Sequence, residues 1–202
     1  MKKIVFLVSL MLTLAVGSGA ALADSIKGRL GVTGRIGFLL PADSDFENFK
    51  LESDAGFLGG GGFIYGITDN LAAEIDVTRT EFGVNLVDGR GQGDFGITNI
   101  SLGVQYRFLI PQPKLVPYAG GGLDILVSDY KRPSGVNANV DTVVGVHLSG
   151  GIDYFFMKQL ALNAEVKGII APEADIHTPN EGSGNFDPSG IAGTVGIRFF
   201  FN

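Results

Sequence analysis

The chain has 202 residues, with 31 glycines, 15 phenylalanines, no cysteine and no tryptophan, and its formal net charge is −6. The absence of cysteine excludes a disulfide framework, thiol chemistry and a cysteine-ligated zinc site, and the acidic balance argues against nucleic acid as a partner. This length allows one domain with a substantial core or a small barrel.

The first 23 residues have the three parts of a secretory signal peptide. Lys2 and Lys3 precede an apolar run over residues 4–16, and a small-residue segment ends at Ala23, after which we expect cleavage. The run is shorter than the ~20 residues that a spanning helix needs. The mature domain, residues 24–202, keeps 13 of the 15 basic residues against 21 acidic ones, a net charge of −8.

Eight segments of the mature chain alternate between apolar and polar residues with a period of two, which predicts β-strands with one apolar face. In chain order they cover residues 26–40, 57–67, 71–80, 99–108, 116–128, 144–156, 160–170 and 189–202. Long polar connections over residues 41–53, 81–95, 129–141 and 172–188 alternate with three short turns. The pattern is typical of an all-β fold, an eight-stranded antiparallel up-and-down transmembrane β-barrel with both termini in the periplasm of a Gram-negative cell.

Aromatic residues support this topology independently. If the even-numbered strands run towards the periplasm, their outward faces should end there in a girdle of aromatic rings. The outward phase of these four strands does end in such rings: Tyr65, Tyr106, Tyr154 and Phe199. We therefore expect the protein in the cell outer membrane, in contact with lipid and lipopolysaccharide. A soluble secreted β-sandwich is the alternative fold.

The last strand is apolar on one face and ends in Gly196, Phe199 and Phe201, spaced Gly-x-x-aromatic-x-aromatic. An unpaired edge of this kind would template aggregation, so it must be sealed, most simply by closure of the barrel. The ending resembles the C-terminal signal by which outer-membrane barrels are recognised for assembly, although Asn202 follows the last aromatic residue. The resemblance implies the barrel-assembly machinery as a partner during biogenesis.

In architecture, signal and terminal strand, the mature chain resembles the small eight-stranded outer-membrane barrels, the group of the OmpA transmembrane domain, OmpX and the OmpW-like porins. OmpW-type proteins usually carry tryptophans, which this chain lacks, so no subfamily is assigned. The resemblance implies structural anchoring, surface contact or restricted permeation, and it singles out no catalytic residue and no surface ligand.

The inward phase decides whether anything passes, because an eight-stranded barrel is only wide enough for its own side chains. Five cations and five carboxylates fall in this phase, a balance that favours a plugged lumen cross-linked by ion pairs over a selectivity ring of one sign. These residues are Arg29, Arg35, Glu74, Asp76, Arg107, Asp124, Asp153, Glu165, Lys167 and Arg198. A small passive channel for ions or solutes is the alternative, since inward glycines leave some room.

One constellation resembles an enzyme: His147 and Ser149, with Glu165 inward on the next strand, contain the groups of a hydrolytic triad. The pair is similar to the His-x-Ser of outer-membrane lipid A deacylases. In that family Asn follows the pair and the site faces lipid, whereas Gly150 follows here and the predicted phase faces the lumen. We expect a polar lumen network, no enzyme, no cofactor and no metal site.

Loop carboxylates leave divalent cation binding open as a further alternative, although a solvated surface explains them equally well. They are Asp43, Asp45, Glu47, Asp54, Glu173 and Asp175.

Overall fold

A computed structural model describes residues 25–42, 44–46, 49–53, 55–86, 91–112, 114–131, 137–177 and 184–201. The predicted signal peptide, residues 1–23, lies outside this part of the chain. Within the described ranges the secondary structure consists of thirteen β-strands. None of those ranges contains a helix long and apolar enough to cross a membrane.

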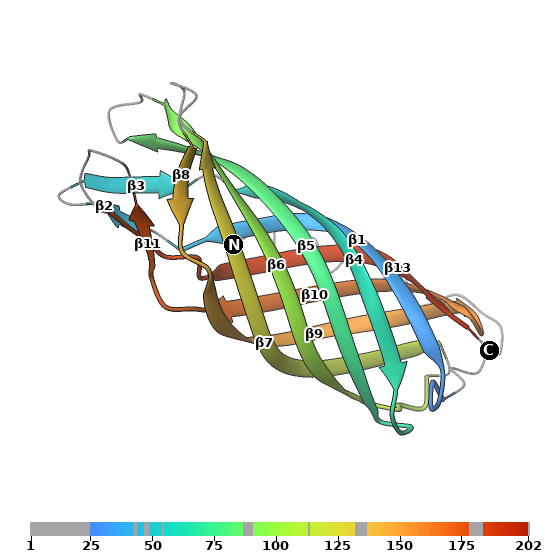
Figure 1. The fold of residues 1–202 in the computed structure, drawn as a ribbon. Helices are drawn as coiled ribbons and strands as arrows, with labels where there is room; N and C mark the ends of the chain where they lie inside the picture. Colours follow the sequence, from blue (N-terminus) through green and yellow to red (C-terminus); the bar gives the residue numbers. More distant parts are fainter. Residues whose placement is uncertain are drawn as a thin grey trace.

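Eight of the strands form a closed barrel in which every neighbouring pair is antiparallel (Figure 1). They are β1 (Leu30–Pro41), β4 (Gly56–Gly66), β5 (Leu71–Leu86), β6 (Gly91–Arg107), β7 (Leu115–Lys131), β9 (Val143–Met157), β10 (Leu160–Ile170) and β13 (Gly190–Phe200). The barrel closes where β1 pairs with β13, from Gly31 opposite Phe200 to Pro41 opposite Gly190. The predicted eight-stranded antiparallel barrel is confirmed.

Side chains of the barrel alternate between the outer face and the lumen. On β13 the outward side chains remain 40% to 56% exposed, namely Ile191, Val195, Ile197 and Phe199. Thr194, Arg198 and Phe200 alternate with them and are buried. The apolar phase therefore covers the outside of the barrel, as a surface in contact with lipid requires.

The first strand begins at Leu30, and its predicted start at residue 26 is wrong. Arg29 N donates a hydrogen bond to Ile26 O at 2.9 Å, and Gly28 has a φ of 73°, so the chain turns here. Only glycine adopts this left-handed conformation without strain. The turn places the buried side chain of Ile26 across the mouth of the barrel at this end. The predicted topology assigns this end to the periplasm, so we call it the periplasmic mouth.

Three of the four predicted loops, over residues 41–53, 129–141 and 172–188, contain strands that the alternation did not predict. They are β2 (Ser44–Phe46), β3 (Phe49–Ser53), β8 (Asn137–Val140), β11 (Ala174–His177) and β12 (Gly184–Phe186). β3 pairs with the end of β5, and β2 pairs with β3. On the other side, β8 pairs with the end of β7, β11 pairs with β8, and β12 pairs with β11. β2 and β12 are in contact, so these five strands and the ends of β5, β6 and β7 form one assembly, the outer extension, beyond the barrel wall (Figure 1).

Candidate functional site

Arginine and carboxylate side chains cross the middle of the lumen. Arg198 is fully buried and donates from Nη1 to Asp153 Oδ2 at 3.0 Å and from Nη2 to Glu74 Oε1 at 2.8 Å. Arg35 donates from Nη2 to the same Glu74 oxygen at 2.6 Å and from Nη1 to Glu165 Oε1 at 2.9 Å. These four charge-assisted hydrogen bonds join β13, β9, β5, β1 and β10, which lie on different sides of the barrel.

Tyr118 and Asn163 close these contacts into a ring. The Tyr118 hydroxyl donates to Glu165 Oε2 at 2.8 Å, and Asn163 Nδ2 donates to Tyr118 Oη at 2.9 Å and to Asp153 Oδ1 at 2.7 Å. The Arg198 guanidinium also lies 5.2 Å from the centroid of the Tyr118 ring, a cation–π contact. We call this set the lumen ring: Arg35, Glu74, Tyr118, Asp153, Asn163, Glu165 and Arg198.

Further charged groups attach to the lumen ring. Arg107 donates from Nη2 to Asp153 Oδ2 at 2.7 Å, and Arg35 Nη2 lies 3.0 Å from Asp76 Oδ1. Because every partner is nearly or fully buried, removing one charge would leave another unpaired in a medium where that costs several kcal/mol. The charges therefore act as one cross-link between the strands.

Glycines on neighbouring strands make room for these large side chains. Arg35 lies opposite Gly60 on β4 and Gly196 on β13, and Tyr118 lies opposite Gly151 on β9. A Cβ atom at Gly151 would stand 2.5 Å from Tyr118 Cζ, closer than any real contact. The inward glycines therefore accommodate the lumen side chains, and the space that the channel alternative assigned to them is occupied at these positions.

Apolar side chains close the lumen on both sides of the polar layer. Towards the periplasm, Phe155 and Phe200 stack with their centroids 5.7 Å apart. They belong to a periplasmic apolar cluster that comprises Ile26, Ile64, Ala72, Val116, Phe155, Ala161 and Phe200. At the other end lies an outer apolar ring of buried residues, Leu39, Leu58, Ile97, Leu126, Ile169 and Ala192, together with the fully buried Pro188.

A second polar group surrounds Asp124, apart from the lumen ring. His147 Nδ1 lies 2.6 Å from Asp124 Oδ2, and Asn99 Nδ2 donates to Asp124 Oδ1 at 2.8 Å. Ser101 donates to the same carboxylate and accepts a hydrogen bond of 3.2 Å from Lys167 Nζ. The alternation puts His147 and Asp124 in the inward phase of their strands but does not predict that they pair.

Arg29 does not join the other nine predicted lumen charges. Its guanidinium lies at the periplasmic mouth and donates to the main-chain oxygens of Phe201 at 3.2 Å, Lys158 at 3.1 Å and Phe200 at 3.4 Å. Arg29 lies beyond the end of β1, with its guanidinium 5.5 Å from the centroid of the Phe200 ring, so the periplasmic apolar cluster stands between it and the lumen ring. Arg29 thus links the first strand to the last.

The three groups of the enzyme hypothesis line one small cavity of about 10 Å³ but do not form a triad. His147 is bonded to Asp124, and Glu165 is bonded to Arg35 and Tyr118. Across the described ranges, no three His, Cys, Asp or Glu residues are placed to hold a metal ion. Three of the loop carboxylates considered for cation binding, Asp43, Glu47 and Asp54, lie outside those ranges.

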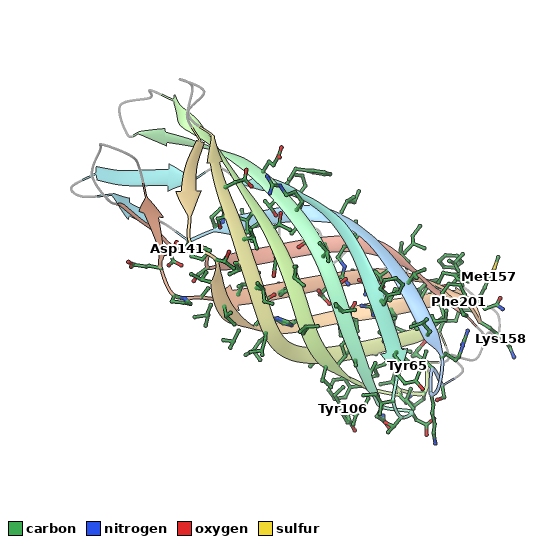
Figure 2. The ribbon with its side chains drawn as sticks, in the orientation of Figure 1. Tyr65, Tyr106, Asp141, Met157, Lys158 and Phe201 are labelled. Atoms are coloured by element: carbon green, nitrogen blue, oxygen red, sulfur yellow. The ribbon has the colours of Figure 1, made fainter. Side chains whose placement is uncertain are left out.

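The predicted girdle residues lie at the end of the barrel where both described termini are found. Tyr65 and Tyr106 are exposed on the outer face at this end, and Phe201 and Lys158 lie at the same end of the barrel (Figure 2). Tyr154 is half-buried, and Phe199 contacts Phe201 edge to face with centroids 5.3 Å apart. Gly196 of the predicted assembly signal faces the lumen beneath Arg35, so it also has a packing role. The recognition of this ending during assembly stays a prediction.

A family model described as an outer membrane protein β-barrel domain matches residues 9–199. The chain belongs to this family. It is therefore a multi-pass protein of the cell outer membrane. With both termini in the periplasm, as the topology predicts, the outer extension would be extracellular. A curated relative, the outer-membrane protein y4mB of Sinorhizobium fredii, is 28% identical over 144 residues, 67% of this chain and 62% of that protein. The match therefore covers less than two thirds of the relative.

Solved structures support the same fold. OprG of Pseudomonas aeruginosa matches with a TM-score of 0.76 and 17% identity, over 90% of this chain and 99% of OprG. Neisserial surface protein A matches with a TM-score of 0.64 and 16% identity, over 85% of this chain and 97% of that protein. At these identities the likeness establishes the fold of the barrel and leaves the function to be argued from the chain itself.

Proposed function

We propose that this family member is a sealed barrel that anchors the outer extension and presents it at the cell surface. The lumen ring carries the proposal, because it fills the middle of the barrel with paired charges held from six strands. A passing ion would have to break these buried pairs and then cross the periplasmic apolar cluster without water, and each step costs several kcal/mol.

The partners in this role are outer-membrane lipid and lipopolysaccharide around the barrel, with the assembly machinery during insertion. We propose no catalytic role. The support is that His147 and Glu165, the two titratable groups of the enzyme hypothesis, are each committed to a different partner within the lumen.

The folded protein should give no stable conductance steps in planar lipid bilayers, because the lumen is closed by charge pairs and by apolar side chains at both ends. The measurement is a set of single-channel records at several voltages, with heat-modifiable migration on gels to establish that the same sample is folded. A larger porin in the same bilayer is the positive control. Reproducible channels from the folded protein would overturn the sealed barrel.

A small passive channel is the second candidate, and two cavities favour it. One of about 30 Å³ lies under the outer apolar ring and one of about 10 Å³ lies deeper, and Glu165 and Lys167 line both. Each is large enough for one or two water molecules at most. If channels do appear, Lys167→Ala should change their ion selectivity, whereas the sealed barrel gives no current for this variant to change.

Epitope tags should separate the two ends of the barrel. A tag after the exposed Asp141, between β8 and β9, should bind antibody on intact cells, because this connection belongs to the extracellular end (Figure 2). A tag after Lys158, in the turn between β9 and β10 at the opposite end, should bind only after the outer membrane is permeabilised. Labelling in the reverse order would place the outer extension in the periplasm and exclude a role at the cell surface.

A further inference from the structure

Apolar side chains remain exposed at the periplasmic end, on one turn and on the last residue of β9. The connection from β6 to β7 exposes Phe108, Leu109 and Ile110, and the end of β9 exposes Met157. The Phe108 ring also packs edge to face on Tyr106 of the girdle, with centroids 5.1 Å apart. Turns that face only water rarely carry such a patch, so these residues indicate contact with the apolar edge of the lipid headgroup region.

Basic residues occupy the same end of the barrel. The described segments outside the strands here contain four basic residues, Lys27, Arg29, Lys114 and Lys158, and one acidic residue, Asp69. The Asp69 carboxylate accepts a hydrogen bond from Ser25, and the Arg29 guanidinium is taken up by main-chain oxygens. The three lysines, which we call the rim lysines, come from the segment before β1 and from the β6–β7 and β9–β10 connections.

Two of the rim lysines, Lys114 and Lys158, adjoin the residues of the apolar patch. Lys114 follows Phe108, Leu109 and Ile110 in one connection, and its main-chain oxygen accepts a hydrogen bond from Phe155 N at 2.7 Å. Lys158 follows Met157 directly. A lysine beside an apolar anchor extends its stem along the lipid and holds its ammonium at the level of the phosphates. Lys114 and Lys158 therefore meet the sequence condition for contact with headgroups.

The opposite end of the protein has the opposite charge. The described part of the outer extension and its connections contains nine acidic residues and three basic ones. The acidic residues are Asp45, Glu52, Glu81, Asp94, Asp129, Asp141, Glu173, Asp175 and Asp187, and the basic ones are Lys50, Arg79 and Lys131. An anionic surface would therefore attract the periplasmic end and repel the outer one.

We propose that the rim lysines and the adjoining apolar turns form a docking surface for anionic phospholipid headgroups in the periplasmic leaflet. The apolar turns fix the depth of the rim, and the lysines select negatively charged headgroups over zwitterionic ones. Each lysine near an anionic membrane surface changes binding by about fivefold, so three together produce a marked preference.

Lipid retention tests this surface directly. The full mature chain is folded into vesicles of phosphatidylcholine mixed with phosphatidylglycerol and is then extracted in mild detergent. The lipids that remain bound to the protein are identified and quantified by mass spectrometry. The wild-type protein should retain phosphatidylglycerol well above its share in the vesicles. The variant Lys27→Gln, Lys114→Gln, Lys158→Gln should lose most of this enrichment, by about tenfold or more, while remaining heat-modifiable on gels.

Two controls keep the result interpretable. Arg79→Gln removes a cation from the other end and should leave the enrichment unchanged. Replacement of the three lysines by arginine keeps the charge and should preserve it. If the triple glutamine variant does not fold, Lys27→Gln alone, in an exposed turn position, should still reduce the enrichment severalfold. Equal enrichment in wild type and the lysine-to-glutamine variants, or no enrichment in the wild type, would overturn the proposal.

Discussion

Replacing Arg198 by methionine should lower the free energy of unfolding by about 3–5 kcal/mol, because both of its carboxylate partners remain buried. Its side chain is fully buried, and it is the residue that joins Asp153 to Glu74 across the lumen. In this variant Asp153 remains paired with Arg107, and Glu74 remains paired with Arg35, but each carboxylate loses one of its two arginine partners. Denaturant unfolding of the protein in lipid vesicles, followed by heat-modifiable migration, measures the change.

An exposed ion pair supplies the control for this prediction. Arg79 pairs with Asp129 at 2.6 Å in the outer extension, where the two side chains are 39% and 43% exposed. Its replacement by glutamine should cost less than about 1 kcal/mol, since solvent screens the pair. The double variant Arg198→Met, Glu74→Gln should recover part of the loss, because one of the stranded carboxylates is removed. Equal effects of Arg198→Met and Arg79→Gln would contradict the role of the lumen ring.

The barrel is predictable from sequence because lipid imposes the same demand on every strand. Each outward position must be apolar, so the alternation on β13, with Ile197 and Phe199 outward around Arg198, recurs on seven other strands. Short turns and long connections then fix the direction of each strand. Neither signal depends on knowing which strands pair or in which register.

The outer extension is not predictable in this way because no lipid imposes a pattern on it. Phe82, Val84 and Leu86 do alternate, but Gly83 and Asn85 between them favour a loop by composition. In the structure β5 continues through this stretch, since its backbone pairs with β6, with Phe82 opposite Phe95. Pairing with a neighbour outweighs the local propensity, as is common in sheets.

The inward phase predicts which charges face the lumen but not which of them pair. The link between Arg35 and Glu165 spans 130 residues and depends on the register and closure of the barrel, which one sequence does not contain. Arg29 has the inward phase but lies at the mouth, on the far side of Phe200 from the lumen ring, and the alternation does not indicate how far along the barrel a residue lies. Without Arg29, the predicted lumen charges are four cations and five carboxylates. The structure also places the imidazole of His147 beside the carboxylate of Asp124.

Substitutions at two neighbouring phenylalanines near the C-terminus should have separate effects, one on the stability of the folded barrel and the other on its insertion into the membrane. Phe200 is fully buried against Phe155 in the periplasmic apolar cluster, and a Cβ at Gly31 would stand 2.9 Å from its ring. Phe200→Ala should therefore lower the free energy of unfolding by about 3–5 kcal/mol, the range for removing a buried phenylalanine. Phe201 points outwards and is 45% exposed, so Phe201→Ser should cost only about 1 kcal/mol once the barrel has formed.

The yield of inserted protein in the outer membrane should fall more for Phe201→Ser than for Phe200→Ala, the reverse of their order in unfolding free energy. Phe201 is the last aromatic residue of the predicted assembly signal, so Phe201→Ser should reduce the amount of inserted protein even though the inserted fraction resists denaturant almost as well as wild type. Phe200→Ala leaves Gly196, Phe199 and Phe201 in place, and its loss should appear in denaturant unfolding of the purified barrel. The measurements are heat-modifiable protein per cell and unfolding in vesicles. Normal insertion of Phe201→Ser would exclude the signal, and wild-type stability of Phe200→Ala would exclude the cluster as the support of the periplasmic end.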